Sequence, residues 1–219
     1  MLYGPPGTGK TMSAKAVAHE LGLPFLSVTS GQLASKWLGD LEKFTRYVFE
    51  IAREEAAKSP FKRAVLFLDE VDALIPKRDD MTHEAVRKQM QEILTALDGF
   101  KSDGSVFVIA ATNRPDLVDN AFRSRMSKEL EIGLPSLEGR AEILMSALEK
   151  KTQRAGRQIV GTCDIAEVAH RMEGFSGRDI KNIVNAVVLA KARRASKEGP
   201  ANVPLIDTSD FDEALANFK

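Results

Sequence analysis

A phosphate-binding pattern constrains the fold of this chain more than any other feature. Residues 4–11 have the sequence GPPGTGKT, which fits the pattern G-x-x-x-x-G-K-[ST]. Glycines in this pattern let backbone N–H groups close around phosphate oxygens, the lysine reaches the β- and γ-phosphates, and the Ser/Thr hydroxyl binds Mg²⁺. The helix that begins at Thr11 directs its positive dipole end at the anion. We expect the ligand contacts to come from Gly4, Pro5, Pro6, Gly7, Thr8, Gly9, Lys10, Thr11 and Met12.

The strand expected before such a loop is short. Only Met1, Leu2 and Tyr3 precede Gly4. Because a phosphate loop normally follows a longer buried strand, we expect the chain to be an N-terminally truncated module that lacks most of this strand and everything upstream.

Charge and composition exclude several classes of protein. The chain holds 31 Lys and Arg residues and 31 Asp and Glu residues, so no net charge favours nucleic acid or an anionic membrane. Runs such as Ala64–Leu68 and Val106–Ala111 are too short to span a bilayer, and no signal peptide precedes the loop. The single cysteine, Cys163, excludes an internal disulfide. We expect a cytoplasmic protein without a nucleic-acid partner and without a membrane segment in this chain, unless an anchor lies upstream.

Apolar runs and helical patterns alternate through the first half of the chain. The run Ala64–Leu68 is continuously apolar, which is typical of a parallel strand buried on both faces. We predict strands at Pro24–Thr29, Ala64–Leu68, Ser105–Ala111 and Glu129–Ile132, and helices at Thr11–Leu21, Leu41–Ala57 and His83–Leu97. The apolar face of the first helix is expected to consist of Ala14, Val17, Ala18 and Leu21. This alternation predicts an α/β fold with a doubly wound parallel sheet that binds ligands at the carboxyl ends of its strands.

The pattern changes at Pro135, after which only helices are predicted. They are Leu137–Lys150, Asp164–Met172, Ser176–Ala195 and Ser209–Phe218. We therefore expect two domains, an α/β domain at residues 1–135 and a small all-helical domain at residues 136–219.

Two predicted strands end in polar side chains suited to phosphate chemistry. Asp69 and Glu70 follow a buried strand, where Asp69 suits Mg²⁺ and Glu70 suits a water that attacks the γ-phosphorus. Alone, such an acidic pair could equally solvate a strand end. Asn113 follows the next strand and could bond both the γ-phosphate and that water. An Asn turn before Pro115 is the simpler interpretation of Asn113 by itself.

Four segments in this order resemble the AAA ATPases: Gly4–Thr11, Leu66–Glu70, Ala111–Asp116 and Gly174–Asp179. The AAA ATPases are the protein-remodelling branch of the AAA+ superfamily, which includes katanin-like, spastin-like and related hexameric unfoldases. The resemblance covers nearly the whole chain. It implies a P-loop NTPase domain followed by a helical lid, ATP and Mg²⁺ as ligands, and a homo-oligomeric ring, expected to be a hexamer, that pulls protein substrates through its pore.

The resemblance also implies roles for individual residues. Thr11 and Asp69 would hold Mg²⁺, and Lys10 would bind phosphate. Glu70 would activate water, with Asn113 as the nucleotide sensor. Two residues of the lid would contact adenosine, Gly177 and Arg178.

A loop with the only tryptophan matches the pore loop of this family. Its residues are Lys36, Trp37, Leu38 and Gly39. A flat aromatic side chain beside glycine can hold any polypeptide by apolar contact, without selecting a sequence. The alternative is that Trp37 packs in the core. The segment Asp98–Phe100 similarly resembles the intersubunit signalling motif of the family, while as bare residues it predicts a turn that ends a helix.

The chain departs from the family pattern at the arginines that reach a neighbouring subunit. Their two expected positions hold Ser124 and Ser127. Arg123 and Arg125 lie close by, and of these we favour Arg125 as the residue that stabilises transition-state charge. Ala147 also stands where many members have a histidine near the ribose. Hydrolysis that is slow, or that needs a partner subunit, is the alternative.

The sequence predicts ATP hydrolysis coupled to remodelling, unfolding or disassembly of protein substrates. Three alternatives stay open: a DNA-associated AAA+ ATPase, a nucleotide-gated scaffold that barely hydrolyses ATP, and the motor subunit of an ATP-dependent protease. A metalloprotease site is not indicated, because His83 and Glu84 do not begin an H-E-x-x-H motif.

Overall fold

The computed structural model of the chain describes residues 1–29, 41–76, 84–198, 205–216 and 218. The chain divides into two units: Met1–Pro5 and Gly9–Ile132 form the first, and Pro6–Thr8 and Gly133–Lys219 form the second. The first unit contains the sheet, and the second contains helices.

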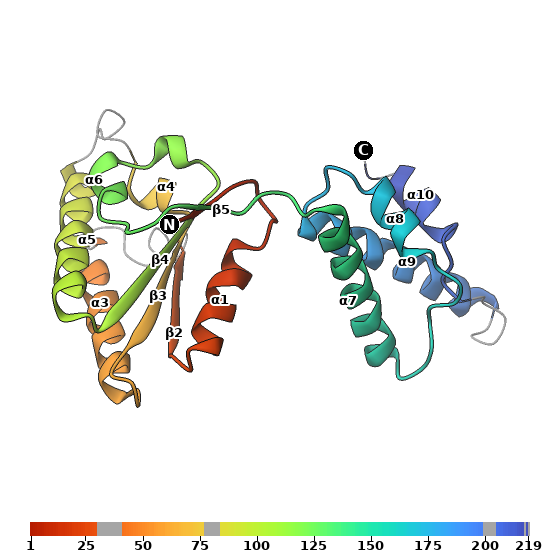
Figure 1. Ribbon diagram of the computed structural model, residues 1–219, viewed down its shortest axis with the longest axis horizontal. Helices are drawn as coiled ribbons and strands as arrows, with labels where there is room; N and C mark the ends of the chain where they lie inside the picture. The colour runs from red at the N-terminus through yellow and green to blue at the C-terminus, as the bar shows by residue number, and fades with distance from the viewer. Residues whose placement is uncertain (30–40, 77–83, 199–204, 217, 219) are drawn as a thin grey trace. The chain divides into compact units, whose positions relative to one another are not determined.

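A five-stranded parallel sheet forms the centre of the first unit (Figure 1). Its strands are β1 (Leu2–Tyr3), β2 (Phe25–Thr29), β3 (Ala64–Asp69), β4 (Val106–Thr112) and β5 (Leu130–Glu131). They lie in the order β2-β3-β4-β1-β5, and every neighbouring pair is parallel. The order changes direction between β4 and β1, which is the position where sheets of this kind bind ligands. The predicted doubly wound parallel sheet is confirmed.

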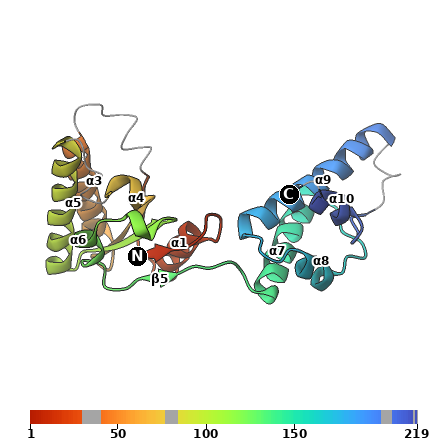
Figure 2. The ribbon, with the colours of Figure 1, turned by 90° about the horizontal axis from the view of Figure 1, so that it is seen from above.

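Helices cover both faces of the sheet (Figures 1 and 2). Helix α1 (Lys10–Glu20) lies on one face, and α3 (Leu41–Lys58) and α5 (Glu84–Asp103) lie on the other. Successive side chains of β3 point alternately to the two faces of the sheet. Leu66 packs in the larger core beside α3 and α5, whereas Phe67 packs with Ala14 of α1. The apolar run of β3 is therefore buried on both faces, as predicted.

The apolar face of α1 is narrower than predicted. Ala14 and Ala18 are buried, whereas Val17 and Leu21 are 46% and 53% exposed. Residues four apart lie on one row of a helix. The row of Lys10, Ala14 and Ala18 is the buried one, and its alanines let the helix approach the sheet closely. The inclusion of Val17 and Leu21 in the buried face was wrong, because they fall on a neighbouring row.

Helix α5 continues past its predicted end, so the expected turn at Asp98–Phe100 was wrong. Phe100 is buried, and the guanidinium of Arg53 lies over its ring, 5.0 Å from the ring centroid. A side chain at Gly99 would place its Cβ only 2.9 Å from Arg53 Nη2. Burial of a phenylalanine contributes about 1.5–3 kcal/mol, which exceeds the cost of about 1 kcal/mol for a helical glycine. The helix therefore continues through the glycine.

Three short elements follow the strand ends and were not predicted. They are α4 (Val71–Leu74), the 3₁₀ helix η2 (Pro115–Leu117) and α6 (Asn120–Arg123). Each is too short to show a helical period in the sequence.

The second unit is built from four helices in its described residues. They are α7 (Leu137–Ala155), α8 (Ile165–Arg171), α9 (Gly177–Glu198) and α10 (Asp210–Ala216), and all four were predicted. Ser136 and Asp164 cap the starts of α7 and α8 with their side chains. Buried residues such as Leu144 and Phe211 form a separate core. Within the described parts of the chain, no helix is both long enough and apolar enough to cross a membrane.

Candidate functional site

The carboxyl ends of three neighbouring strands bring the predicted site residues to one edge of the sheet. The phosphate loop follows β1, Asn113 follows β4, and Asp69 and Glu70 end β3. Strand β4 pairs in parallel with both β1 and β3. Segments far apart in the sequence therefore meet where ligands bind in sheets of this kind.

Lys10 lies at the centre of this edge. Its side chain is buried, and its Nζ donates hydrogen bonds to the carbonyl oxygens of Gly4 and Pro5, both at 2.8 Å. Nζ also donates to Asn113 Oδ1 at 2.7 Å. An ammonium group has three donors. Lys10 thus joins the loop to the end of β4 and places a positive charge beside Asn113.

Thr11 and Asp69 form a second contact across the edge. Thr11 Oγ1 donates to Asp69 Oδ2 at 3.0 Å, and the backbone N–H of Glu70 donates to Asp69 Oδ1 at 3.0 Å. A hydroxyl oxygen and a carboxylate oxygen are hard donors of the kind that Mg²⁺ prefers. No cluster of three or more His, Cys, Asp or Glu side chains that could hold a metal occurs among the described residues. Mg²⁺ commonly takes only one or two protein carboxylates together with substrate phosphates, so this pair fits it.

Glu70 has an unusual backbone conformation. Its φ of 55° and ψ of 47° lie in the left-handed region, directly before α4 begins. This conformation costs a residue with a side chain about 1–2 kcal/mol. The turn leaves Glu70 exposed at the edge beside Asp69. Strained backbone of this kind is concentrated at functional sites.

The loop glycines are required by its geometry. Gly4 has a φ of 140°, and a Cβ there would lie 2.3 Å from the carbonyl oxygen of Ile132. Gly9, at the start of α1, has a φ of 108° and open space where its Cβ would be. Gly9 also has no side chain that could cap α1, so an anion can occupy the end of this 11-residue helix. The loop therefore fits a phosphate group.

The two candidate arginines bind carboxylates of their own chain. Arg125 donates from Nε and Nη2 to the two oxygens of Asp98, both at 2.9 Å, and from Nη1 to the carbonyl oxygen of Ala121 at 2.8 Å. Arg123 donates to Glu129 at 3.0 and 2.7 Å. These hydrogen bonds raise the pKa of Arg123 and lower the pKa of Glu129. The pairing of Arg125 with Asp98 was not predicted, because the two residues are distant in the sequence.

One predicted lid residue contacts the phosphate loop, because the backbone N–H of Arg178 donates to the carbonyl oxygen of Gly7 at 3.1 Å, within the second unit. Gly177 and Arg178 begin α9 in the second unit, where Ser176 and Asp179 form a reciprocal cap. The predicted pore-loop residues lie outside the described residues: Lys36, Trp37, Leu38 and Gly39.

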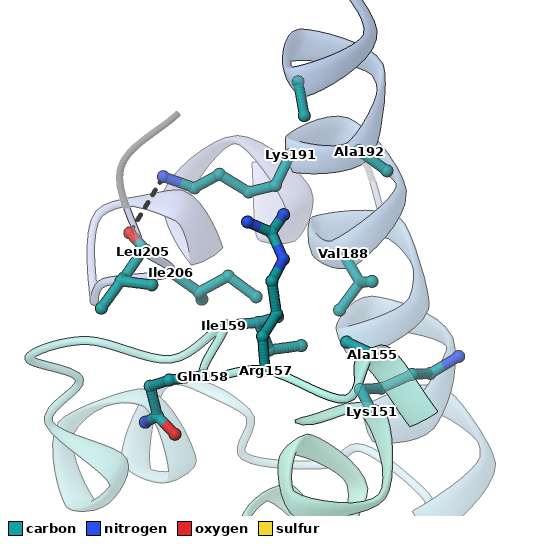
Figure 3. A pocket seen from close by; sticks show the side chains of 11 residues that line it. Lys151, Ala155, Arg157, Gln158, Ile159, Val188, Lys191, Ala192, Leu205 and Ile206 are labelled. Carbon is teal, nitrogen blue, oxygen red and sulfur yellow. Dashed lines mark hydrogen bonds between the residues drawn. The ribbon is translucent and has the colours of Figure 1, made fainter. Parts of the chain in front are cut away.

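Two cavities lie among the described residues of the second unit. The first, of about 180 Å³, is lined mainly by aliphatic side chains, with Lys191 and Arg157 beside them (Figure 3). Lys191 pairs there with Asp210 at 2.7 Å and donates to the carbonyl oxygen of Leu205. The second, of about 380 Å³, includes Cys163, whose thiol pKa is raised by burial. Because burial disfavours the thiolate, Cys163 is a weak nucleophile in this cavity.

Comparisons with known proteins match both parts of the chain. Residues 1–134 match the model of the ATPase family associated with various cellular activities (AAA), and residues 163–213 match the AAA+ lid domain. The Cell division cycle protein 48 homolog of Archaeoglobus fulgidus is 37% identical over 231 residues, which cover all of this chain and 30% of the relative. The proteasome-activating nucleotidase of Methanothermobacter thermautotrophicus is 39% identical over 84% of this chain and 43% of its own length. The chain thus spans less than half of either relative.

A solved structure has the same fold. The crystal structure of the FIGL-1 AAA domain in complex with ADP superposes with a TM-score of 0.81 at 29% identity. The match covers all of this chain and 70% of that chain. FIGL1 of Arabidopsis thaliana is also 37% identical over all of this chain, which covers 32% of that relative.

Proposed function

The chain belongs to the AAA family of ATPases, and on this premise we propose that it couples ATP hydrolysis to the remodelling of protein substrates as part of a hexameric ring. We take residues 1–135 as its nucleotide-binding domain and residues 136–219 as its lid. One observation carries the hydrolytic part of the proposal. Lys10, Thr11, Asp69 and Asn113 converge by hydrogen bonds at the carboxyl edge of the sheet, beside Glu70.

The phosphate loop is the proposed ATP-binding element. Its glycines adopt conformations with positive φ, and the start of α1 provides a site for an anion. Lys10 supplies positive charge to the phosphates. Thr11 and Asp69 are the residues that would hold Mg²⁺, which when bound neutralises charge on the phosphates of its substrate complex.

Glu70 and Asn113 are the proposed catalytic pair. Glu70 is the general base, because it is an exposed carboxylate at the end of β3 next to Asp69. Asn113 is the sensor, because its amide already bonds the lysine that would face phosphate. A neutral amide can both donate and accept hydrogen bonds, so it can orient a water molecule without moving its proton.

Arg125 is the proposed residue that acts on a neighbouring subunit, with Arg123 as the second choice. For this role Arg125 has to leave Asp98, to which it now donates two hydrogen bonds. This pairing also favours a second candidate function, a nucleotide-gated scaffold with slow hydrolysis. Both arginines are held within the chain, and neither occupies the usual family position.

Remodelling of proteins is proposed from the relatives and from the pore-loop motif. Two relatives have names that refer to protein degradation: the proteasome-activating nucleotidase and the ATP-dependent zinc metalloprotease FtsH of Cutibacterium acnes, which is 36% identical over 98% of this chain. Lys36–Gly39 would contact the substrate, and Gly177 and Arg178 would contact adenosine. The balance of 31 basic and 31 acidic residues does not favour DNA as the substrate.

Phosphate release from ATP, measured with and without added macromolecules, tests the remodelling proposal. An unfolded protein is expected to stimulate turnover, and duplex DNA at the same mass concentration is not. Replacement of Trp37 by Ala should abolish the stimulation and leave the basal rate. Stimulation by DNA alone would contradict the proposal in favour of a DNA-associated ATPase.

A further inference from the structure

A buried hydroxyl connects the two strand ends that carry Glu70 and Asn113. It belongs to Thr112, the last residue of β4, which is 1% exposed. Thr112 Oγ1 donates to Asp72 Oδ1 at 2.5 Å and accepts a hydrogen bond from the backbone N–H of Arg114 at 2.9 Å. One buried hydroxyl group therefore serves as both donor and acceptor.

The hydrogen bond from Arg114 fixes the backbone around Asn113. A threonine hydroxyl that accepts the N–H two residues later closes a local turn. Asn113 is the residue enclosed by this turn, and its Oδ1 accepts from Lys10 at 2.7 Å. The direction in which the Asn113 side chain leaves β4 thus depends on the Thr112 hydroxyl.

The hydrogen bond to Asp72 fixes the turn against the segment that follows Glu70. Asp72 is in the first turn of α4, two residues after Glu70, and is half-buried. The segments continue side by side beyond this contact, because the N–H of Asp119 donates to the carbonyl oxygen of Ile75 at 3.1 Å. Pro76 and Val118 also form an antiparallel bridge. The side-chain contact between Asp72 and Thr112 is the part of this connection nearest to the site.

We propose that Asp72 and Thr112 are positioning residues for ATP hydrolysis, which hold Asn113 in a fixed relation to Glu70. The inference rests on the proposed function of Glu70 and Asn113. Neither Asp72 nor Thr112 needs to contact the nucleotide. A misplacement of catalytic groups by about 1 Å can cost up to about 100-fold in rate, so a hydrogen-bonded link between the two segments has a measurable effect.

Four substitutions separate the role of the hydrogen bonds from that of the side-chain volume. Thr112→Val keeps the shape but removes both hydrogen bonds and leaves the Asp72 carboxylate without this donor. Thr112→Ser keeps the hydroxyl. Asp72→Ala removes the acceptor, whereas Asp72→Asn keeps one. Thr95→Val is the matched control, because Thr95 is exposed on α5 and donates within its own helix, to the carbonyl oxygen of Gln91.

The test measures kcat and KM for ATP, nucleotide affinity and thermal stability of the full chain. Thr112→Val and Asp72→Ala are expected to lower kcat by about 10- to 100-fold and to leave nucleotide affinity within about threefold. Thr112→Ser, Asp72→Asn and Thr95→Val are expected to stay within about threefold of the unsubstituted chain in kcat. The double variant that combines Thr112→Val with Asp72→Ala should lose no more than either single variant, because both substitutions remove one connection.

Two results would overturn the inference. One is a kcat of Thr112→Val within about twofold of the unsubstituted chain. The other is an equal loss of kcat and nucleotide affinity that Thr112→Ser does not restore, since that indicates a general role in folding. If Thr112→Val does not fold, the comparison of Asp72→Ala with Asp72→Asn decides between the same outcomes. Failure of the proposed function would give a different result from failure of this inference. If the proposed function is wrong, the unsubstituted chain hydrolyses ATP no faster than Glu70→Gln.

Discussion

Phe100 is expected to be a major determinant of stability in the first unit, although it ends a motif that the sequence placed in a turn. It is 2% exposed, and its ring centroid lies 5.3 Å from that of Phe49. Phe100→Ala removes a fully buried ring and should lower the free energy of unfolding by about 3–5 kcal/mol. At about 2–4 °C per kcal/mol for a chain of this size, the transition of this unit should shift by roughly 6–20 °C.

Phe107→Ala is the matched control. Phe107 is 44% exposed, and the guanidinium of Arg63 lies 5.5 Å from its ring centroid. The Phe100 ring has a similar contact, because the guanidinium of Arg53 lies 5.0 Å from its centroid. Each ring therefore has a cation–π contact worth about 0.5–1 kcal/mol, and the two rings differ mainly in burial. The control should lose only about 1–2 kcal/mol. Urea denaturation followed by circular dichroism measures both, and equal losses would refute the argument from burial.

Two further predictions concern charge pairs near the candidate site. Asp98→Asn weakens the surface ion pair with Arg125, which is worth about 1 kcal/mol. Because Arg125 is then released from Asp98 more often, ATP turnover in a phosphate-release assay is expected to rise by up to about fivefold. A fall in turnover would show that Asp98 assists Arg125 instead. Hydrogen bonds from Arg123 lower the pKa of Glu129, so their contribution to stability is present above the ordinary glutamate pKa and is lost as the pH falls through the lowered value. In a plot of melting temperature against pH, Glu129→Gln should therefore reduce the slope on the acid side. An unchanged slope there would contradict this.

The sequence predicted the central strand β3 well because this strand is buried on both faces. A continuous apolar run such as Ala64–Leu68 has few alternatives to a central parallel strand, and β3 extends this run by only one residue. The phosphate pattern and the acidic pair were informative because each follows a strand directly. Parallel pairing then brings their ends to one edge of the sheet.

Long-range contacts determined several features that were not predicted. The continuation of α5 through Gly99 depends on the burial of Phe100 and on Arg53, which belongs to another helix. The pairing of Asp98 with Arg125 joins residues that no local pattern connects. The link between Asp72 and Thr112 was missed as well, although both residues adjoin predicted site residues.

We propose that ATP hydrolysis takes place at the residues that converge on the carboxyl edge of the sheet. The most direct test of this proposal is the rate of phosphate release by the chain and by Glu70→Gln at saturating ATP and Mg²⁺, with the affinity of each for a fluorescent ATP analogue. Glu70→Gln is expected to lower the rate by at least about 100-fold and to leave the affinity within about threefold. Equal rates for the two proteins would contradict it.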